Sequence, residues 1–180
     1  MLACLDVAYD DTRAHAGCLV FHDWGDSRAH AEHVSTTPLA APYVPGAFFE
    51  RELPPMLDVL SRVKEPLEAI VVDGYVWLSG KGKGLGAHLF EALGERVPIV
   101  GVAKNEWTRP ALPGEDRAHR CIPIVRGAST RPLFVTSTGV DVEVAAARIA
   151  SMHGPHRLPT LLKAVDALVR AAAARVTTRP

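Results

Sequence analysis

Hydrophobic and polar positions in the first third of the chain follow the pattern of β-strands. Apolar runs cover about residues 2–9, 16–22 and 29–35, and the polar segments 10–13 and 23–28 separate them. Short apolar runs bounded by polar, turn-forming residues are typical of strands joined by tight turns. The pattern therefore predicts that the fold begins with a β meander.

The middle of the chain alternates between helical and strand-like spacing. Apolar residues recur every three or four positions over 48–60 and 85–93, which predicts two helices. Short continuous apolar runs at 69–72 and 97–103 predict buried strands. A strand, a helix and a second strand in this order form a right-handed parallel crossover in nearly all known folds. We therefore expect parallel strands to follow the meander in one sheet.

The last third of the chain continues the alternation of strands and helices. Two strands and two helices are predicted there, over 121–125, 133–136, 141–152 and 158–174. No repeat or interdomain linker separates the predicted elements, and a length of 180 residues suits one hydrophobic core. We predict a single α/β domain over 1–180, in which helices flank a mixed central sheet and residues 176–180 form a frayed tail.

Charged residues interrupt or end three of the buried strands. Asp6 lies within the first strand, and Asp73 and Lys104 directly follow the two central apolar runs. A buried carboxylate needs a partner, and a salt bridge or a capping hydrogen bond is the ordinary solution. Two such carboxylates also suit a divalent ion, because Mg²⁺ prefers oxygen ligands. Ligands of α/β sheets bind outside the carboxyl ends of the strands, so these residues are candidates for a site.

Composition narrows the class of protein. No apolar run approaches the ~18 residues that span a membrane, and the first residues lack the pattern of a signal peptide, so we expect a soluble, cytoplasmic protein. Cys4, Cys18 and Cys121 are far apart and have no CxxC spacing, which predicts buried free thiols rather than disulfides or a zinc site.

The charge balance gives no overall attraction to nucleic acid. The formal net charge is +0, whereas phosphate-binding proteins usually present a basic face. Basic residues nevertheless concentrate between 104 and 131, where a local basic face or an ordinary solvated loop are both consistent with the sequence. These basic residues are Lys104, Arg109, Arg117, Arg120, Arg126 and Arg131.

Several segments together resemble the endonuclease V family. The four most specific segments, in chain order, are LDVAY (5–9), PYVPGAFFERELP (42–54), VVDGY (71–75) and VPIVGVAK (97–104). Two further segments, PLFVTSTG (132–139) and HRLPTLLKAVDAL (156–168), agree with the same family. The resemblance covers nearly the whole chain and implies a ribonuclease H-like fold.

The resemblance assigns roles to the charged residues. It implies that Asp6, Glu52 and Asp73 are catalytic carboxylates that hold Mg²⁺, for which Mn²⁺ would substitute. The residues alone do not distinguish Glu50 from Glu52, whereas the family motif selects Glu52. Lys104 matches a lysine whose ammonium would neutralise charge near the cleaved phosphate.

The resemblance also implies residues that contact the nucleic acid. The segment Pro42-Tyr43-Val44-Pro45 looks like the family's wedge, which fills the space left by a flipped base, although a proline-rich turn with a packed tyrosine is the ordinary alternative. Glycines in the family's base pocket let the flipped base approach the main chain. The matching glycines here are Gly74, Gly84 and Gly101.

The sequence departs from the family at two histidine positions. Ser79 and Val140 stand where the family has histidines, the second of them near the metal. Asp141 is a candidate compensating metal ligand, although an aspartate at this position also suits a helix N-terminus. Lys81 and Lys83 lie in a glycine-rich segment that is either a substrate-binding loop or a plain connector.

The leading hypothesis is therefore a Mg²⁺-dependent endonuclease. It would hydrolyse a phosphodiester bond on the 3′ side of a deaminated purine, inosine, in DNA or RNA, for repair or processing of the nucleic acid. The alternative is an inosine-binding module of the same fold with impaired catalysis. We expect DNA or RNA containing deaminated bases to be the partner, no membrane association, and a monomer.

Overall fold

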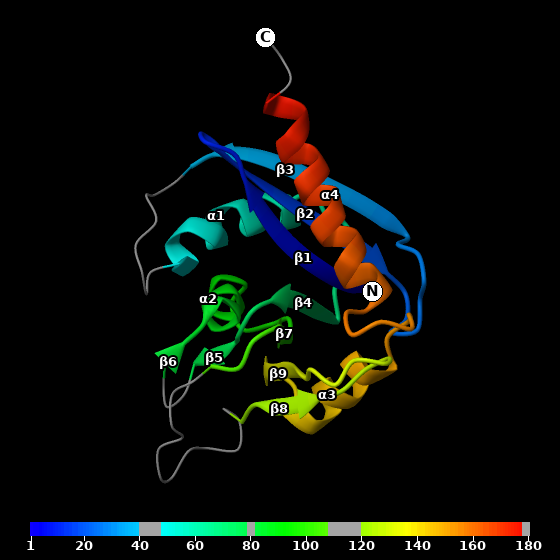
Figure 1. The fold of residues 1–180 in the computed structure, drawn as a ribbon. Helices are drawn as coiled ribbons and strands as arrows, with labels where there is room; N and C mark the ends of the chain where they lie inside the picture. The colour runs from blue at the N-terminus through cyan, green and yellow to red at the C-terminus, as the bar shows by residue number, and fades with distance from the viewer. Residues whose placement is uncertain (40–47, 79–81, 108–119, 178–180) are drawn as a thin grey trace.

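A seven-stranded mixed sheet organises the protein, with strand order β3-β2-β1-β4-β7-β9-β8. The computed structural model describes residues 1–39, 48–78, 82–107 and 120–177 (Figure 1). The strands of this sheet are β1 (Leu2–Tyr9), β2 (Arg13–Phe21), β3 (Ala31–Pro38), β4 (Ala69–Asp73), β7 (Ile99–Ala103), β8 (Ile122–Ile124) and β9 (Leu133–Thr138). The helices are α1 (Phe48–Leu60), α2 (Leu85–Ala92), α3 (Val142–Ser151) and α4 (Thr160–Thr177).

The strand directions confirm the predicted meander and the parallel strands. β1, β2 and β3 pair antiparallel, and β1 pairs parallel with β4, which in turn pairs parallel with β7. β9 runs antiparallel to β7, and β8 antiparallel to β9. The carboxyl ends of β1, β4 and β7 therefore lie at one edge of the sheet, whereas β9 ends at the opposite edge.

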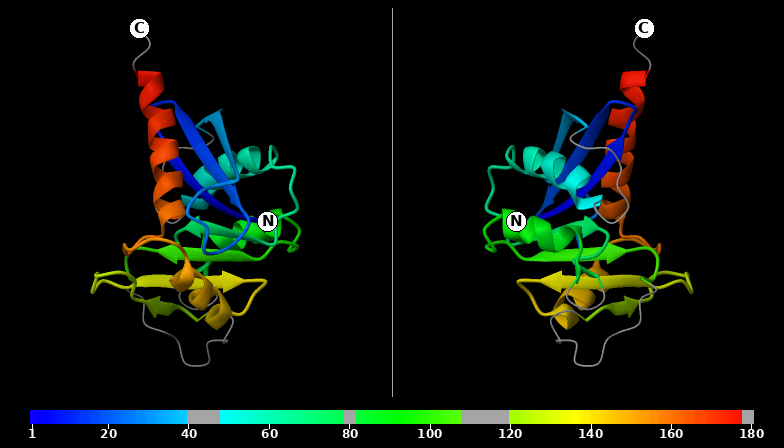
Figure 2. Two further views of the ribbon diagram at one scale, coloured as in Figure 1. Left: turned by 90° about the vertical axis from the view of Figure 1, so that its right-hand side faces the viewer. Right: turned by 90° about the vertical axis from the view of Figure 1, so that its left-hand side faces the viewer.

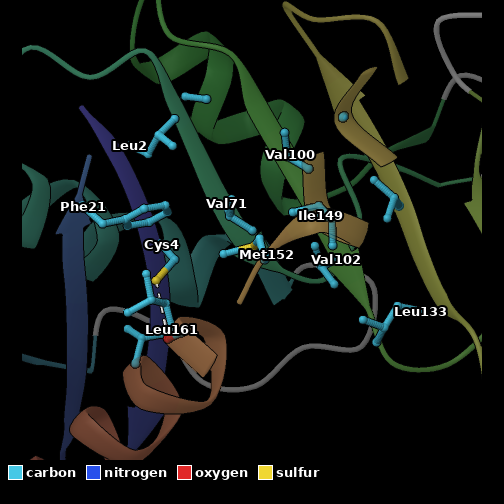
Figure 3. Packing of buried hydrophobic residues seen from close by; sticks show 14 of the residues in the cluster. Leu2, Cys4, Phe21, Val71, Val100, Val102, Leu133, Ile149, Met152 and Leu161 are labelled. Atoms are coloured by element: carbon cyan, nitrogen blue, oxygen red, sulfur yellow. Dashed lines mark hydrogen bonds between the residues drawn. The ribbon is translucent and has the colours of Figure 1, made fainter. Parts of the chain in front are cut away.

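Helices cover both faces of the sheet (Figures 1 and 2). The core side chains of α3 and α4 pack on one face, together with alternate residues of β1, β4 and β7. The residues that alternate with these along each strand pack on the other face of the sheet, with α1 and α2. Figure 3 shows the first of these cores, where the Cys4 thiol donates a hydrogen bond to the carbonyl of Leu161 in α4 (3.6 Å). Alternation along each strand thus decides which side chains face α4.

A glycine in β2 permits the close approach of α4. A Cβ atom at Gly17 would lie 2.7 Å from Val169 Cγ1 of the helix, a separation that real Cβ atoms do not adopt. Gly17 pairs with Asp6 across the β1–β2 ladder. The same glycine therefore brings α4 against the strand that carries Asp6.

Two features of the fold differ from the sequence predictions. A short antiparallel hairpin, β5 (Trp77–Leu78) and β6 (Gly82–Lys83), stands apart from the main sheet in a segment expected to be a loop. Cys121 is exposed, whereas Cys4 and Cys18 are buried as expected, and all three thiols are free. Cys121 directly precedes the short edge strand β8.

Within the described ranges, no helix is both long enough and apolar enough to cross a membrane.

Candidate active site

Three charged side chains converge where the central parallel strands end. The register pairs Leu5 of β1 with Val72 of β4, so Asp6 and Asp73 are the next residues on neighbouring strands. Lys104 directly follows β7. Each of the three lies two residues beyond a core side chain that packs toward α3 and α4, so strand alternation turns all three toward the α4 face.

Lys104 and Asp73 form an ion pair. The Lys104 ammonium donates to Asp73 Oδ2 at 2.5 Å, and both side chains are 39% exposed. Burial by itself would lower the pKa of Lys104, but the hydrogen bond and charge of Asp73, with the charge of Asp6, outweigh it and raise the pKa. Arg157 donates hydrogen bonds to the main-chain carbonyls of Lys104 and Pro132, which ties this strand end to the segment before α4.

Glu52 reaches the same place from α1. Glu52 is only 7% exposed. Burial, reinforced by the negative charges of Asp6 and Asp73, raises the pKa of its carboxyl group to about 8. Burial, followed by the charge of Asp73, raises the pKa of Asp6 to about 6. Since carboxylates raise one another's pKa only at short range, the three predicted acids form one electrostatically coupled cluster.

An aromatic contact fixes α1 beside the end of β1. The Arg51 guanidinium carbon lies 4.0 Å from the centre of the Tyr9 ring. Burial raises the pKa of the Tyr9 hydroxyl, and the charge of Glu52 raises it further. Arg51 and Glu52 are consecutive in the helix, so the stacked arginine holds the glutamate near Asp6.

A fourth acid, Asp166 of α4, belongs to this site and was not predicted. It lines the same hollow as Asp6 and Asp73, and its charge contributes to the raised pKa of Asp6. Its carboxylate accepts a hydrogen bond from Arg170 one turn later (2.9 Å). A signal for it existed, because an acid four residues after Leu162 and three before Val169 lies beside the apolar face of the helix.

Two cavities meet at the acidic cluster. The larger cavity, of about 560 Å³, is lined by Tyr9, Glu52 and Gly74 in addition to the residues that both cavities share. The other cavity, of about 430 Å³, extends between the sheet and α4. Residues that line both are Asp6, Asp73, Lys104, Asp166 and Arg170. Asp6, Asp73 and Asp166 are therefore accessible from both cavities, whereas Glu52 lines only the larger one.

The acidic cluster fits a divalent cation. Burial, followed by the charges of neighbouring acids, raises the pKa of Asp6 and of Glu52, and a bound cation would offset both effects. Among the described residues, no group of three or more His, Cys, Asp or Glu side chains is arranged to hold a metal ion. Mg²⁺ is typically held by only one or two protein carboxylates together with water and substrate phosphate, so Asp6 and Asp73 are the candidate ligands.

Asp141 does not join the cluster, which corrects the expectation that it supplies a metal ligand. Its carboxylate accepts hydrogen bonds from the main-chain N–H groups of Glu143 (3.0 Å) and Val144 (3.2 Å), so it is the N-cap of α3. Asp141 follows β9, which runs antiparallel to β7, and therefore lies at the opposite edge of the sheet. Its neighbour Val140 lines a separate cavity of about 160 Å³ with Pro98, which precedes β7, so this position is not near the acids either.

Replacing Asp141 with alanine is expected to lower the free energy of unfolding by about 1 kcal/mol, the usual value of an N-cap side chain. The nuclease activity that the sequence resemblance implies should not change, because the residue lies outside both cavities at the acidic cluster. Thermal unfolding and a cleavage assay on the same preparation measure the two effects. A large loss of activity without loss of stability would restore the ligand hypothesis.

The three predicted pocket glycines have different surroundings. Gly74 lines the larger cavity, has a φ of +113° and has free space where a Cβ atom would lie. A Cβ atom at Gly101 would lie 2.6 Å from the Gly74 carbonyl, and one at Gly84 would lie 2.3 Å from the Tyr75 carbonyl. Gly84 and Gly101 thus allow tight packing of the main chain at 74–76, of which Gly74 lines the cavity.

The remaining predicted nucleic-acid contacts are mostly beyond the described ranges. Pro42, Tyr43, Val44 and Pro45 lie outside the described residues, as do Ser79 and Lys81. Lys83 is described and forms an ion pair with Glu91 (2.5 Å). The Lys83 ammonium is therefore paired with a carboxylate of α2.

The fold and the site together define a class of protein. A meander followed by parallel strands, with acids on the first and fourth strands and a third acid from a helix, is the arrangement of a ribonuclease H-like nuclease. The family model for endonuclease V matches residues 1–167. The chain therefore belongs to the endonuclease V family of divalent-metal-dependent nucleases.

Individual relatives agree with this assignment. Endonuclease V of Streptomyces coelicolor is 34% identical over 184 residues, which cover 93% of this chain and 77% of the relative. The crystal structure of endonuclease V from Streptomyces avermitilis superposes with a TM-score of 0.78 at 30% identity and covers 98% of this chain and 82% of that one. A Ciona intestinalis endonuclease V, in complex with DNA containing an inosine, has the same fold, with a TM-score of 0.76 at 18% identity over 97% of this chain and 86% of that one.

Proposed function

We propose that this chain is a monomeric, Mg²⁺-dependent endonuclease that hydrolyses a phosphodiester bond on the 3′ side of inosine in DNA or RNA. The observation that carries the proposal is the coupled cluster of Asp6, Glu52 and Asp73, with the Lys104 ammonium beside it, in an accessible hollow. Nucleic acid containing inosine is bound by a relative of the same family. The retained acids and lysine give no support to a binding module without catalysis.

Asp6 and Asp73 would hold the metal, with Glu52 beside them. The donor set is made of carboxylate oxygens, which suits Mg²⁺, and Mn²⁺ would substitute for it. When bound, the ion supplies activation of water and offsets charge on the phosphate oxygens. Binding of a cation would also shift Asp6 and Glu52 toward their ionised forms.

Lys104 would contribute a positive charge at the phosphate. The raised pKa keeps its ammonium charged at neutral pH, and the ion pair with Asp73 holds it at the strand end. A fixed cation at this point stabilises negative charge that develops as the phosphodiester bond breaks. Arg157 would keep the main chain of Lys104 in place while the substrate binds.

The flipped base would lie in the larger cavity. Gly74 presents its main chain there without a side chain, and Gly84 and Gly101 support the wall behind it. We propose that Pro42, Tyr43, Val44 and Pro45 fill the space that the base leaves in the stack. Lys81 and Lys83 would contact phosphates, which for Lys83 requires release from Glu91.

Matched oligonucleotides test this function directly. DNA and RNA strands that differ only in one inosine or guanosine are incubated with the protein and Mg²⁺, and the products are mapped at nucleotide resolution. A single cut on the 3′ side of inosine, with the guanosine strand intact, is the expected result. Equal cleavage of both strands would show a nuclease without inosine specificity.

Replacing Asp166 with asparagine is expected to lower the cleavage rate by roughly 10- to 100-fold, as for residues that support a metal site. The variant removes a negative charge from the hollow but leaves the shape of the side chain. Asp58→Asn is a matched control, because Asp58 also pairs with an arginine one turn later, Arg62, but lies outside the two cavities at the cluster. Equal rates for the two variants would exclude a role for Asp166.

A further inference from the structure

The second cavity at the acidic cluster, which runs along helix α4, has no role in the function proposed above. We call it the α4 cavity, and its volume is about 430 Å³. An apolar wall is formed by Leu158, which lies just before α4, and by Leu162 and Val165 of the helix. Lys163 and Ala167 of α4 also line the cavity. This volume lies within the range of about 300–1,000 Å³ that is usual for small-molecule pockets.

The charge of the α4 cavity differs from that of its neighbour. Acidic and basic side chains are balanced here, because Asp6, Asp73 and Asp166 lie with Lys104, Lys163 and Arg170. The larger cavity lacks Lys163 and has Glu52 in addition, so four acids there lie with only two basic side chains. An anionic segment of substrate is therefore better accommodated along α4 than beside Glu52.

The arrangement of the cavities matches the chemistry of a strand that is cut between them. A phosphodiester bond has a nucleoside on each side, and the acids that would act on it lie at the junction of the two cavities. An apolar wall suits the face of a base or a sugar, and a lysine at the rim suits a phosphate oxygen. The two cavities thus lie on two sides of the point at which the bond would be cut.

We propose that the α4 cavity binds a nucleotide of the strand on the far side of the cleaved bond from the base beside Gly74, with Lys163 contacting a phosphate of that nucleotide. This inference rests on the proposed function, because it places a second part of the same nucleic-acid strand. Ala167 lies on the exposed side of α4 and lines the cavity, so a large side chain there blocks it without entering the core.

The first test fills the α4 cavity. Ala167→Trp is compared with Ala171→Trp, which places the same side chain on an exposed position of α4 that lines neither cavity at the cluster. Inosine oligonucleotides are shortened stepwise from the 5′ end or from the 3′ end. Ala167→Trp should lower the affinity for long strands about tenfold or more, the loss expected for one nucleotide's contacts. The loss should vanish when the strand is shortened on one side of the cut, and only on that side.

The second test removes the charge at the rim. Lys163→Ala is expected to reduce the slope of log Kd against log salt concentration by about one relative to wild type. Lys64→Ala, an exposed lysine between α1 and β4 and far from the strand ends at the cluster, should leave the slope unchanged. Affinity is measured by fluorescence anisotropy with EDTA, so cleavage is not required.

The outcomes separate this inference from the function on which it rests. A wild-type protein that cleaves no inosine strand contradicts the proposed function, while the binding data still report on the cavity. An equal loss for Ala167→Trp on every substrate length, or no loss at all, would overturn the subsite. So would an identical salt slope for Lys163→Ala and Lys64→Ala.

Discussion

Replacing Asp73 with asparagine is expected to reduce cleavage of inosine-containing strands by roughly 10²- to 10³-fold or more, the scale of losing one group that stabilises charge in a transition state. The substitution removes a proposed metal ligand and the ion-pair partner of Lys104 in one step. It also removes a charge that raises the pKa of Asp6 and Glu52. The variant should therefore fold at least as well as wild type in the absence of metal.

Single-turnover cleavage and thermal unfolding of the same samples check both parts of this result. Asp58→Asn is the control for the loss of a charged carboxylate at a helix surface, and it should cleave at the wild-type rate. If Asp73→Asn retains activity within about threefold, the assignment of Asp73 to the chemistry is wrong, because a factor of three is less than 1 kcal/mol. If activity and stability are both lost, the residue is needed for folding.

The metal-free protein is expected to become less stable as the pH rises from 5 to 8. Burial, with the charges of Asp6 and Asp73, raises the pKa of Glu52 from 4.5 to about 8, and burial, with the charge of Asp73, raises that of Asp6 from 3.8 to about 6. An acid with a raised folded-state pKa stabilises the fold while it is protonated, so its contribution is present below the unfolded pKa and is lost as the pH passes the folded value. For Glu52 alone the loss is about 3 kcal/mol over this range.

Denaturant unfolding at several pH values, with EDTA or with Mg²⁺, measures this loss. Mg²⁺ should restore most of the stability at pH 8, because a cation that binds the folded state favours the ionised acids. Glu52→Gln should flatten the pH dependence, whereas Glu50→Gln, at an exposed position of the same helix, should leave it unchanged. A metal-free protein that is equally stable at pH 5 and pH 8 would contradict the coupled, buried cluster.

Much of the fold follows from local patterns of residues. The apolar runs located β1, β4 and β7, and the acids that interrupt or end the first two are the ones that meet in the hollow. Two consequences of strand geometry were sufficient for this. Parallel strands end at one edge, and alternate residues share a face, so Asp6 and Asp73 had to lie close together.

The parts that the sequence did not reveal depend on packing between distant segments. The position of Asp166 in the site depends on α4 crossing β1 and β2, which the missing side chain of Gly17 allows. Asp141 was a candidate ligand with the N-terminus of a helix as its alternative role, and the antiparallel direction of β9 places it at the other edge of the sheet. The β5–β6 hairpin is too short to leave a recognisable pattern of alternation.

The choice between Glu50 and Glu52 is a similar case. Both lie in the first turns of α1, and either is an ordinary surface glutamate by composition. In the structure Glu50 is exposed and Glu52 is 7% exposed beside Asp6. The family motif selected Glu52, and the burial of α1 against β2 supplies the physical reason.

We propose that the acids at the ends of β1 and β4 drive cleavage by holding a divalent ion. The most direct test is the single-turnover cleavage rate of an inosine strand by EDTA-treated wild-type protein, titrated with Mg²⁺ and separately with Mn²⁺. We predict no cleavage without added ion and a rate that rises to saturation with either metal. Cleavage at full rate in EDTA, or no cleavage of any inosine strand at any metal concentration, would contradict the claim.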